Sequence, residues 1–84
     1  MSVLSLSEQE DIVIDDLAVA MKFKFSVHRT KGGWSHKNHE TLYSELLREC
    51  EELKEAKTKE AVISECADIA NYCAMIIDLA KREL

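Results

Sequence analysis

The 84-residue sequence contains no proline and only two glycines, which stand together at Gly32 and Gly33. Proline and glycine are the residues that most readily interrupt helices, so this chain has few places where a helix must end. A composition of 46% hydrophobic and 32% charged residues excludes a disordered chain and is typical of a folded one. We therefore expect an all-α fold and a single helical domain over residues 1–84.

The sequence also lacks the patterns of disulfide-linked and membrane proteins. Its three cysteines, Cys50, Cys66 and Cys73, are odd in number and show no CxxC spacing, which predicts reduced thiols buried inside helices. No apolar run approaches the roughly 20 residues of a transmembrane helix. The start of the chain has neither the basic residues nor the cleavage pattern of a signal peptide. We expect a soluble, cytoplasmic protein without a membrane partner.

Acidic residues are missing from one segment, residues 17–39, although five of the 11 basic residues lie there. All 16 acidic residues lie elsewhere, and the net charge is −5. Because the chain is acidic overall, we expect no nucleic-acid partner. A basic segment beside an acidic cluster suits a small anion that binds together with a metal ion, and a solvated basic loop is the alternative. The basic residues of the segment are Lys22, Lys24, Arg29, Lys31 and Lys37.

Capping residues and apolar periodicity predict three helices. Ser7 and Glu10 have the spacing of a capping box at the start of the first helix. Ser35 or Asn38 is in position to cap the second helix, and Thr58 the third. The three helices are expected at about residues 8–27, 38–57 and 59–83.

The third expected helix is apolar around most of its circumference, so it needs neighbours on several sides. The other two expected helices are too few to surround it within one chain. A chain of this length also buries only a small core by itself. We therefore expect three helices per chain that pair with a second chain into a four-helix-type bundle. The expected assembly is a homodimer or a homotetramer.

Seven carboxylates lie within residues 49–68, and some of them interrupt stripes that are otherwise apolar. In the second helix Glu49 occupies a position inside the apolar stripe, and Glu52 follows one turn later. The third helix repeats this arrangement, because Glu65 and Asp68 stand in a stripe whose other members are alanine, tyrosine, methionine and leucine. Four acids are thus predicted at positions where a helical bundle normally carries apolar side chains.

Burying carboxylates without partners is costly, and burying several together is more so. A tight turn at residues 57–59 between antiparallel helices would bring the two acid pairs face to face. Carboxylates that converge in this way either take up protons or bind a cation, and an all-oxygen set suits Mg²⁺ or Mn²⁺ better than zinc. The predicted metal ligands are Glu49, Glu52, Glu65 and Asp68. A solvated acidic face is expected for the remaining acids of the region, Glu45, Glu51, Glu55 and Glu60.

The four acids also carry a family resemblance. The motif E-x2-E at Glu49 and Glu52, twelve intervening residues, and E-x2-D at Glu65 and Asp68 resemble the signature of the MazG-type all-α NTP pyrophosphohydrolases. That superfamily includes dimeric dUTPases, dCTP pyrophosphatases and phosphoribosyl-ATP pyrophosphohydrolases. The strings "ELKEA" and "ECADIANYCAMIID" support the resemblance, which covers about residues 34–78.

The resemblance implies cleavage of a nucleoside triphosphate between its α and β phosphates, giving a monophosphate and pyrophosphate. The four acids would hold Mg²⁺, which neutralises charge on the leaving group. A house-cleaning role against noncanonical or excess nucleotides is implied as well. Arg48 stands where the family often has the first Glu of E-E-x-x-E. A metal- and nucleotide-binding regulator with little turnover is therefore one alternative, and a structural helical module is another.

Candidate substrate-binding residues lie in the basic segment and on the third helix. Lys31 and Lys37 are expected to contact the outer phosphates. Trp34, the only tryptophan, suits either stacking on a base or a core position. The resemblance places Tyr72 near the base or sugar, with core packing as the competing interpretation. Asn71 suits substrate binding, which we favour, or a contact between helices. The sequence assigns neither a general base nor a preferred nucleotide.

Overall fold

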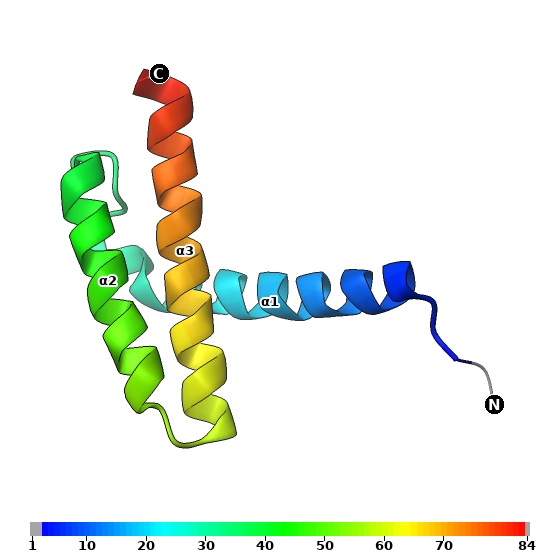
Figure 1. The fold of residues 1–84 in the computed structure, drawn as a ribbon. Helices are drawn as coiled ribbons and strands as arrows, with labels where there is room; N and C mark the ends of the chain where they lie inside the picture. Colours follow the sequence, from blue (N-terminus) through cyan, green and yellow to red (C-terminus); the bar gives the residue numbers. More distant parts are fainter. Residues whose placement is uncertain (1–2, 84) are drawn as a thin grey trace.

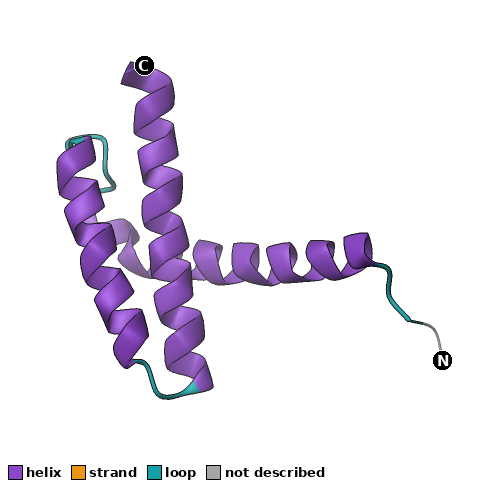
Figure 2. Ribbon diagram, in the orientation of Figure 1, coloured by secondary structure: helices purple, strands orange, loops and turns teal. Residues whose placement is uncertain are grey.

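The computed structural model describes residues 3–83, which form three long helices (Figures 1 and 2). No strand occurs in this part of the chain, so the expected all-α fold class is confirmed. None of the helices within it is both long and apolar enough to cross a membrane. The helices are α1 (Leu6–His28), α2 (His39–Glu55) and α3 (Lys59–Glu83), and a short 3-10 turn, η1 (Arg29–Lys31), follows α1.

The capping box of α1 lies earlier in the sequence than predicted. We expected Ser7 and Glu10 to form it. Instead Ser5 Oγ accepts from the backbone N–H of Glu8 at 3.2 Å, and Glu8 Oε1 accepts from the backbone N–H of Ser5 at 3.0 Å. The Ser-x-x-Glu spacing occurs twice, at Ser5 and Glu8 and again at Ser7 and Glu10. A helix that starts at the earlier pair forms backbone hydrogen bonds that a start at the later pair would leave unmade. The hydrogen bonds from Ser5 lower the pKa of Glu8.

The caps predicted for the other two helices are present. Asn38, one of two candidates, caps α2, because its Oδ1 accepts from a backbone N–H in the first turn at 2.8 Å. Thr58 Oγ1 accepts a similar bond of 3.0 Å at the start of α3. Between η1 and α2 the chain turns at Gly32 and Gly33, whose φ angles of 93° and 74° favour glycine. All helix ends lie within two residues of those expected.

α2 and α3 form an antiparallel hairpin joined by a short turn at residues 56–58 (Figure 1). Among the described residues, α1 packs on α3 and not on α2. The C-terminal half of α1 crosses behind the hairpin, while its N-terminal half projects away from it (Figure 1). The radius of gyration is therefore 14.9 Å, against about 12 Å for a compact domain of this length.

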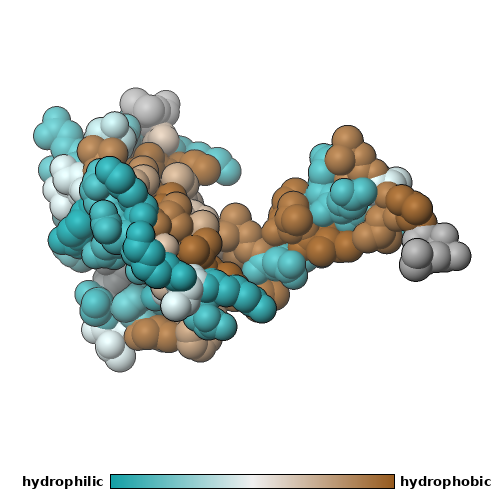
Figure 3. Space-filling model, turned by 60° about the horizontal axis from the view of Figure 1, so that its bottom comes forward, coloured by the Kyte–Doolittle hydropathy of each residue, from teal (hydrophilic) through white to brown (hydrophobic). Residues whose placement is uncertain are grey.

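Few apolar side chains are fully buried in this open arrangement. Among residues 3–83 the buried apolar residues are Leu42, Ala67 and Leu79, and all three belong to the hairpin. No residue of α1 is buried, and the projecting part of this helix is largely apolar at its surface (Figure 3). The large apolar side chains that α1 exposes are Leu6, Ile12, Val13, Ile14, Leu17, Val19, Phe23 and Val27.

The prediction of buried cysteines is wrong for the single chain. Cys50 and Cys73 are exposed and Cys66 is half-buried, and all three are free thiols. α2 covers one side of α3 and part of α1 covers another, so the rest of its circumference faces outward. The same incomplete cover leaves Ile63 and Ile77 of α3 exposed.

Candidate metal and phosphate site

Three carboxylates from the two helices of the hairpin converge. One oxygen atom from each of Glu49, Glu65 and Asp68 lies within 4.8 Å of the other two. We call these three residues the carboxylate cluster. Glu49 lies on the face of α2 that packs against α3 and is only 9% exposed. The structure therefore brings together acids from both helices, as the interrupted apolar stripes predict.

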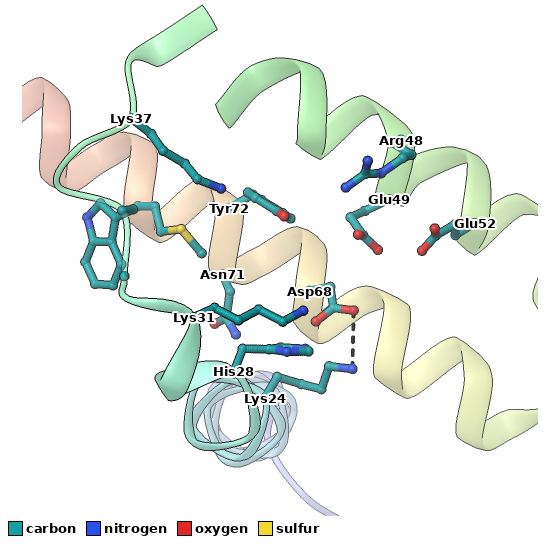
Figure 4. A pocket seen from close by; sticks show the side chains of 13 residues that line it. Lys24, His28, Lys31, Lys37, Arg48, Glu49, Glu52, Asp68, Asn71 and Tyr72 are labelled. Atoms are coloured by element: carbon teal, nitrogen blue, oxygen red, sulfur yellow. Dashed lines mark ion pairs between the residues drawn. The ribbon is translucent and has the colours of Figure 1, made fainter. Parts of the chain in front are cut away.

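Glu52, the fourth predicted ligand, lies beside the carboxylate cluster. It is exposed, and it lines the same pocket as Glu49 and Asp68. The carboxylates of Glu49 and Glu52 face each other from successive turns of α2 (Figure 4). Glu52 is thus placed to support the cluster or to join it when a cation binds.

Two members of the carboxylate cluster, Glu49 and Glu65, lack hydrogen-bond donors for one oxygen each. Glu49 Oε2 and Glu65 Oε2 are buried without a hydrogen-bond partner. Burial, followed by the close approach of the Glu52 and Glu65 carboxylates and the negative charges of Glu52 and Asp68, raises the pKa of Glu49 to about 8. A divalent cation relieves all of these unfavourable terms at once, because it supplies charge and accepts lone pairs from several oxygens. The donor set therefore fits Mg²⁺ or Mn²⁺.

A pocket of about 330 Å³ lies beside the carboxylate cluster and has charged walls of opposite sign (Figure 4). Its acidic residues come from α2 and α3, and its basic residues come from α1, η1, the following loop and α2. This combination suits a polyanion that binds together with a metal ion. The acidic residues that line the pocket are Glu49, Glu52 and Asp68, and the basic residues are Lys24, His28, Lys31, Lys37 and Arg48.

Lys24 is a site residue that the sequence analysis left without a role. Its Nζ lies 3.3 Å from Asp68 Oδ2 and donates a hydrogen bond of 2.9 Å to Ser64 Oγ. His28 also lines the pocket and was likewise not assigned to it. A signal was present in the sequence, because Lys24, His28 and Lys31 follow one another at spacings of four and three, which favour one face of a helix.

Lys37, predicted to contact phosphate, pairs with Glu45 in the structure. Its Nζ lies 2.9 Å from both carboxylate oxygens of Glu45, and both side chains are half-buried. The expectation that Glu45 belongs to a solvated face is therefore wrong, because the loop before α2 folds back over it. Burial, with the negative charge of Glu45 next in importance, raises the pKa of Tyr72 to about 12. Tyr72 thus keeps its hydroxyl proton at neutral pH and lines the pocket as a donor.

Trp34 connects the loop to two helices. Its Nε1 donates a hydrogen bond of 2.9 Å to Asp78 Oδ2 on α3, and its ring centroid lies 5.7 Å from that of Phe25 on α1. Asp78 also pairs with Arg82 at 2.9 Å. The packing interpretation of Trp34 accounts for these contacts, and the residue also lines the pocket, so the stacking interpretation stays open.

Asn71 makes the contact between helices that was one of its two predicted roles. It is 4% exposed, and its Nδ2 donates to the backbone carbonyl of Met21 on α1 at 3.0 Å. Its Oδ1 is buried without a partner, and the residue lines the pocket. The amide therefore positions α1 against α3, and its oxygen stays buried without a partner.

No protein-family model, curated protein or solved structure matches this chain. The resemblance to the MazG-type enzymes accordingly rests on the spacing of the four acids and the strings around them. The convergence of the acids in space is independent of that resemblance, because it follows from the packing of α2 on α3.

Proposed function

We propose that the protein is a Mg²⁺-dependent nucleoside triphosphate pyrophosphohydrolase, which converts a (d)NTP to a (d)NMP and pyrophosphate. The observation that carries this proposal is the carboxylate cluster, with the unpartnered oxygens of Glu49 and Glu65. Its members Glu49 and Asp68 line a pocket that is also lined by basic side chains. The spacing of the four acids supports the same reaction class. A cytoplasmic location and a house-cleaning role agree with it.

In this proposal Glu49, Glu65 and Asp68 hold the metal ion, and Glu52 is the fourth acid of the site. Mg²⁺, with Mn²⁺ as a substitute, supplies Lewis-acid polarisation of phosphate oxygens and neutralises the leaving pyrophosphate. Burial and the neighbouring carboxylates raise the pKa of Glu49, so ionisation of this side chain is unfavourable without a cation, and a bound cation would favour the ionised form.

The substrate's phosphates are assigned to the basic residues of the pocket. Lys31 and Arg48 line it directly, and Lys37 reaches a phosphate by exchanging its partner Glu45 for that anion. The hydroxyl of Tyr72 donates a hydrogen bond to the substrate. Trp34 lines the pocket together with the apolar Met75, which favours this end for the base.

The protein is proposed to act as a homodimer or homotetramer, in which paired chains form a four-helix-type bundle. The support is the exposed apolar surface of α1, which has no cover from its own chain. Large exposed apolar surfaces mark protein interaction sites, and burying this one stabilises the chain.

A nucleotide panel tests the activity. Each canonical and noncanonical (d)NTP is incubated with Mg²⁺ or Mn²⁺ and assayed for the monophosphate and pyrophosphate. Turnover should appear with at least one nucleotide and disappear in both Glu49→Ala and Asp68→Ala. The matched control is Glu60→Ala, which removes an exposed acid at the start of α3 and should leave turnover unchanged.

A regulator that binds metal and nucleotide without turnover is the second candidate, and Arg48 favours it. This residue lines the pocket next to Glu49 and places a fixed positive charge beside the acids. Folded protein without turnover would overturn the enzyme proposal. A rise in melting temperature with Mg²⁺ and nucleotide would then support the regulator, because ligands that bind only the folded state stabilise it. No rise would favour a structural module.

A further inference from the structure

The positively charged side chain of Lys24 lies beside the candidate metal ligands. Lys24 extends from α1 to α3, where its Nζ lies 3.3 Å from Asp68 Oδ2 and 2.9 Å from Ser64 Oγ. Ser64 and Asp68 are one helical turn apart, so the two acceptors lie on the same side of α3. The side chains of Lys24 and Asp68 are both 18% exposed, which shields their pairing from solvent.

Asp68 belongs at the same time to the carboxylate cluster. The ammonium group of Lys24 and a divalent cation would therefore share one carboxylate and repel each other over a short distance. In the metal-free protein the ion pair is favourable, because the ammonium group of Lys24 neutralises Asp68 at a largely shielded position. A bound metal ion removes that gain, since it takes over the neutralisation of Asp68.

The pocket offers the Lys24 side chain a second position when it leaves Asp68. It lines the pocket together with His28 and Lys31, and Figure 4 shows these three side chains extending toward the acids from the same side. A lysine side chain is a flexible stem with a compact charge, and phosphate oxygens are strong acceptors for it. Ser64 is neutral, so it opposes this movement only weakly.

We propose that Lys24 is a displaceable internal cation, which holds Asp68 in the metal-free protein and transfers to a phosphate group when metal and nucleotide bind. The inference rests on the proposed function, because it takes the carboxylate cluster as the metal site. Lys24 thereby couples the two ligands: it weakens binding of metal alone and strengthens binding of metal together with phosphate.

Binding of Mn²⁺ and of inorganic triphosphate to the full-length protein tests this coupling without any turnover. Titration calorimetry measures the affinity for Mn²⁺ alone and then for inorganic triphosphate at saturating Mn²⁺. Lys24→Met, which keeps the apolar stem, should bind Mn²⁺ about five- to ten-fold more tightly and triphosphate about ten-fold more weakly than the natural chain. Lys24→Gln, which keeps polar contacts to Ser64 and Asp68, should change both affinities in the same directions.

The matched control is Lys22→Met, which removes the same charge from an exposed position on the same helix, outside the pocket. It should leave both affinities within about two-fold. Weaker Mn²⁺ binding in both Lys24 variants would mean that Lys24 only supports the fold, and this would overturn the proposal. Tighter Mn²⁺ binding with unchanged triphosphate affinity would overturn the transfer to phosphate.

Failure of this inference is distinct from failure of the proposed function. Unchanged Mn²⁺ affinity in the Lys24 variants, with turnover intact in the natural chain, would overturn the internal cation alone. A natural chain that binds no Mn²⁺ at any concentration would overturn the metal site, and the internal cation with it.

Discussion

The α2–α3 hairpin and helix α1 distribute their side chains in opposite ways. The hairpin buries polar groups, Glu49 and Asn71, whereas α1 exposes apolar residues such as Val13, Ile14 and Val19. Burying apolar surface stabilises a fold and burying a carboxylate opposes it, so neither distribution favours the isolated chain. Each fits an added partner: a cation for the hairpin and, as proposed above, a second copy for α1.

The largest expected effect comes from making the hairpin apolar at its buried acid. Glu49→Leu should lower turnover by at least about 100-fold, because the site loses a ligand and the charge that holds the metal. The same change should raise the melting temperature of the metal-free protein at pH 8 by several degrees, because it removes an unpartnered buried oxygen. Activity assays and thermal unfolding of one preparation measure both.

A fall in turnover together with a rise in melting temperature distinguishes a functional acid from a structural one. A large fall in melting temperature would indicate that Glu49 supports the fold. The matched variant is Glu60→Leu at an exposed position, which should change neither quantity appreciably.

The exposed face of α1 gives the next largest effect. Ile14, which is 62% exposed, is replaced by lysine. If a second copy covers this face, Ile14→Lys should weaken association by about ten-fold or more, because a charge would then be buried without a partner. Sedimentation at several protein concentrations measures the change. Gln9→Lys adds the same charge to the same helix without removing apolar surface, and a similar loss in this control would contradict the prediction.

The stability of the metal-free protein should depend on pH through Glu49. Its pKa rises from the ordinary 4.5 to about 8 in the folded chain, so the folded state holds this proton more tightly than the unfolded state. The resulting stability is complete below about pH 4.5 and is lost as the pH rises through 8. The melting temperature should therefore fall by several degrees between pH 5 and pH 9.

Saturating Mg²⁺ should reverse that trend, because the cation favours the ionised carboxylate. Thermal unfolding with and without Mg²⁺ measures both curves. Glu49→Gln removes the titrating group, and an equally steep fall in this variant would assign the effect to other residues.

The smallest effect concerns the junction of the two regions at Trp34. Trp34→Phe keeps the packing on Phe25 but removes the donor to Asp78, so it should cost about 1 kcal/mol of unfolding free energy. For a domain of this size the melting temperature falls by about 4–8 °C per kcal/mol. Chemical denaturation gives the free energy directly. An unchanged value would show that solvent replaces the lost bond.

The pairing of acids across the hairpin could be predicted from the sequence because it depends on local geometry. Glu49 interrupts an apolar stripe of α2. The short turn after α2 constrains α3 to run antiparallel beside it. The caps at Asn38 and Thr58 are local for the same reason. Even local signals fail when they are repeated, as the choice of Ser5 over Ser7 at the start of α1 shows.

Contacts that depend on the path of α1 could not be predicted in this way. Lys24 lies 40 residues from Ser64 in sequence, and Asn71 lies 50 from Met21. Their meeting is set by where α1 crosses α3, which no periodicity encodes. The exposure of Cys73 has a similar origin, because it follows from how much of α3 the other helices leave uncovered.

The separation between local and distant contacts also implies an order of folding. The hairpin closes through a short turn, so its contacts form at little entropic cost, whereas α1 must dock on α3 across a long stretch of chain. Lys24, His28 and Lys31 reach the acids only when that docking occurs. We therefore expect the hairpin to form first, with its carboxylates already brought together but without the basic wall of the pocket. The step that completes the fold is then also the step that completes the pocket.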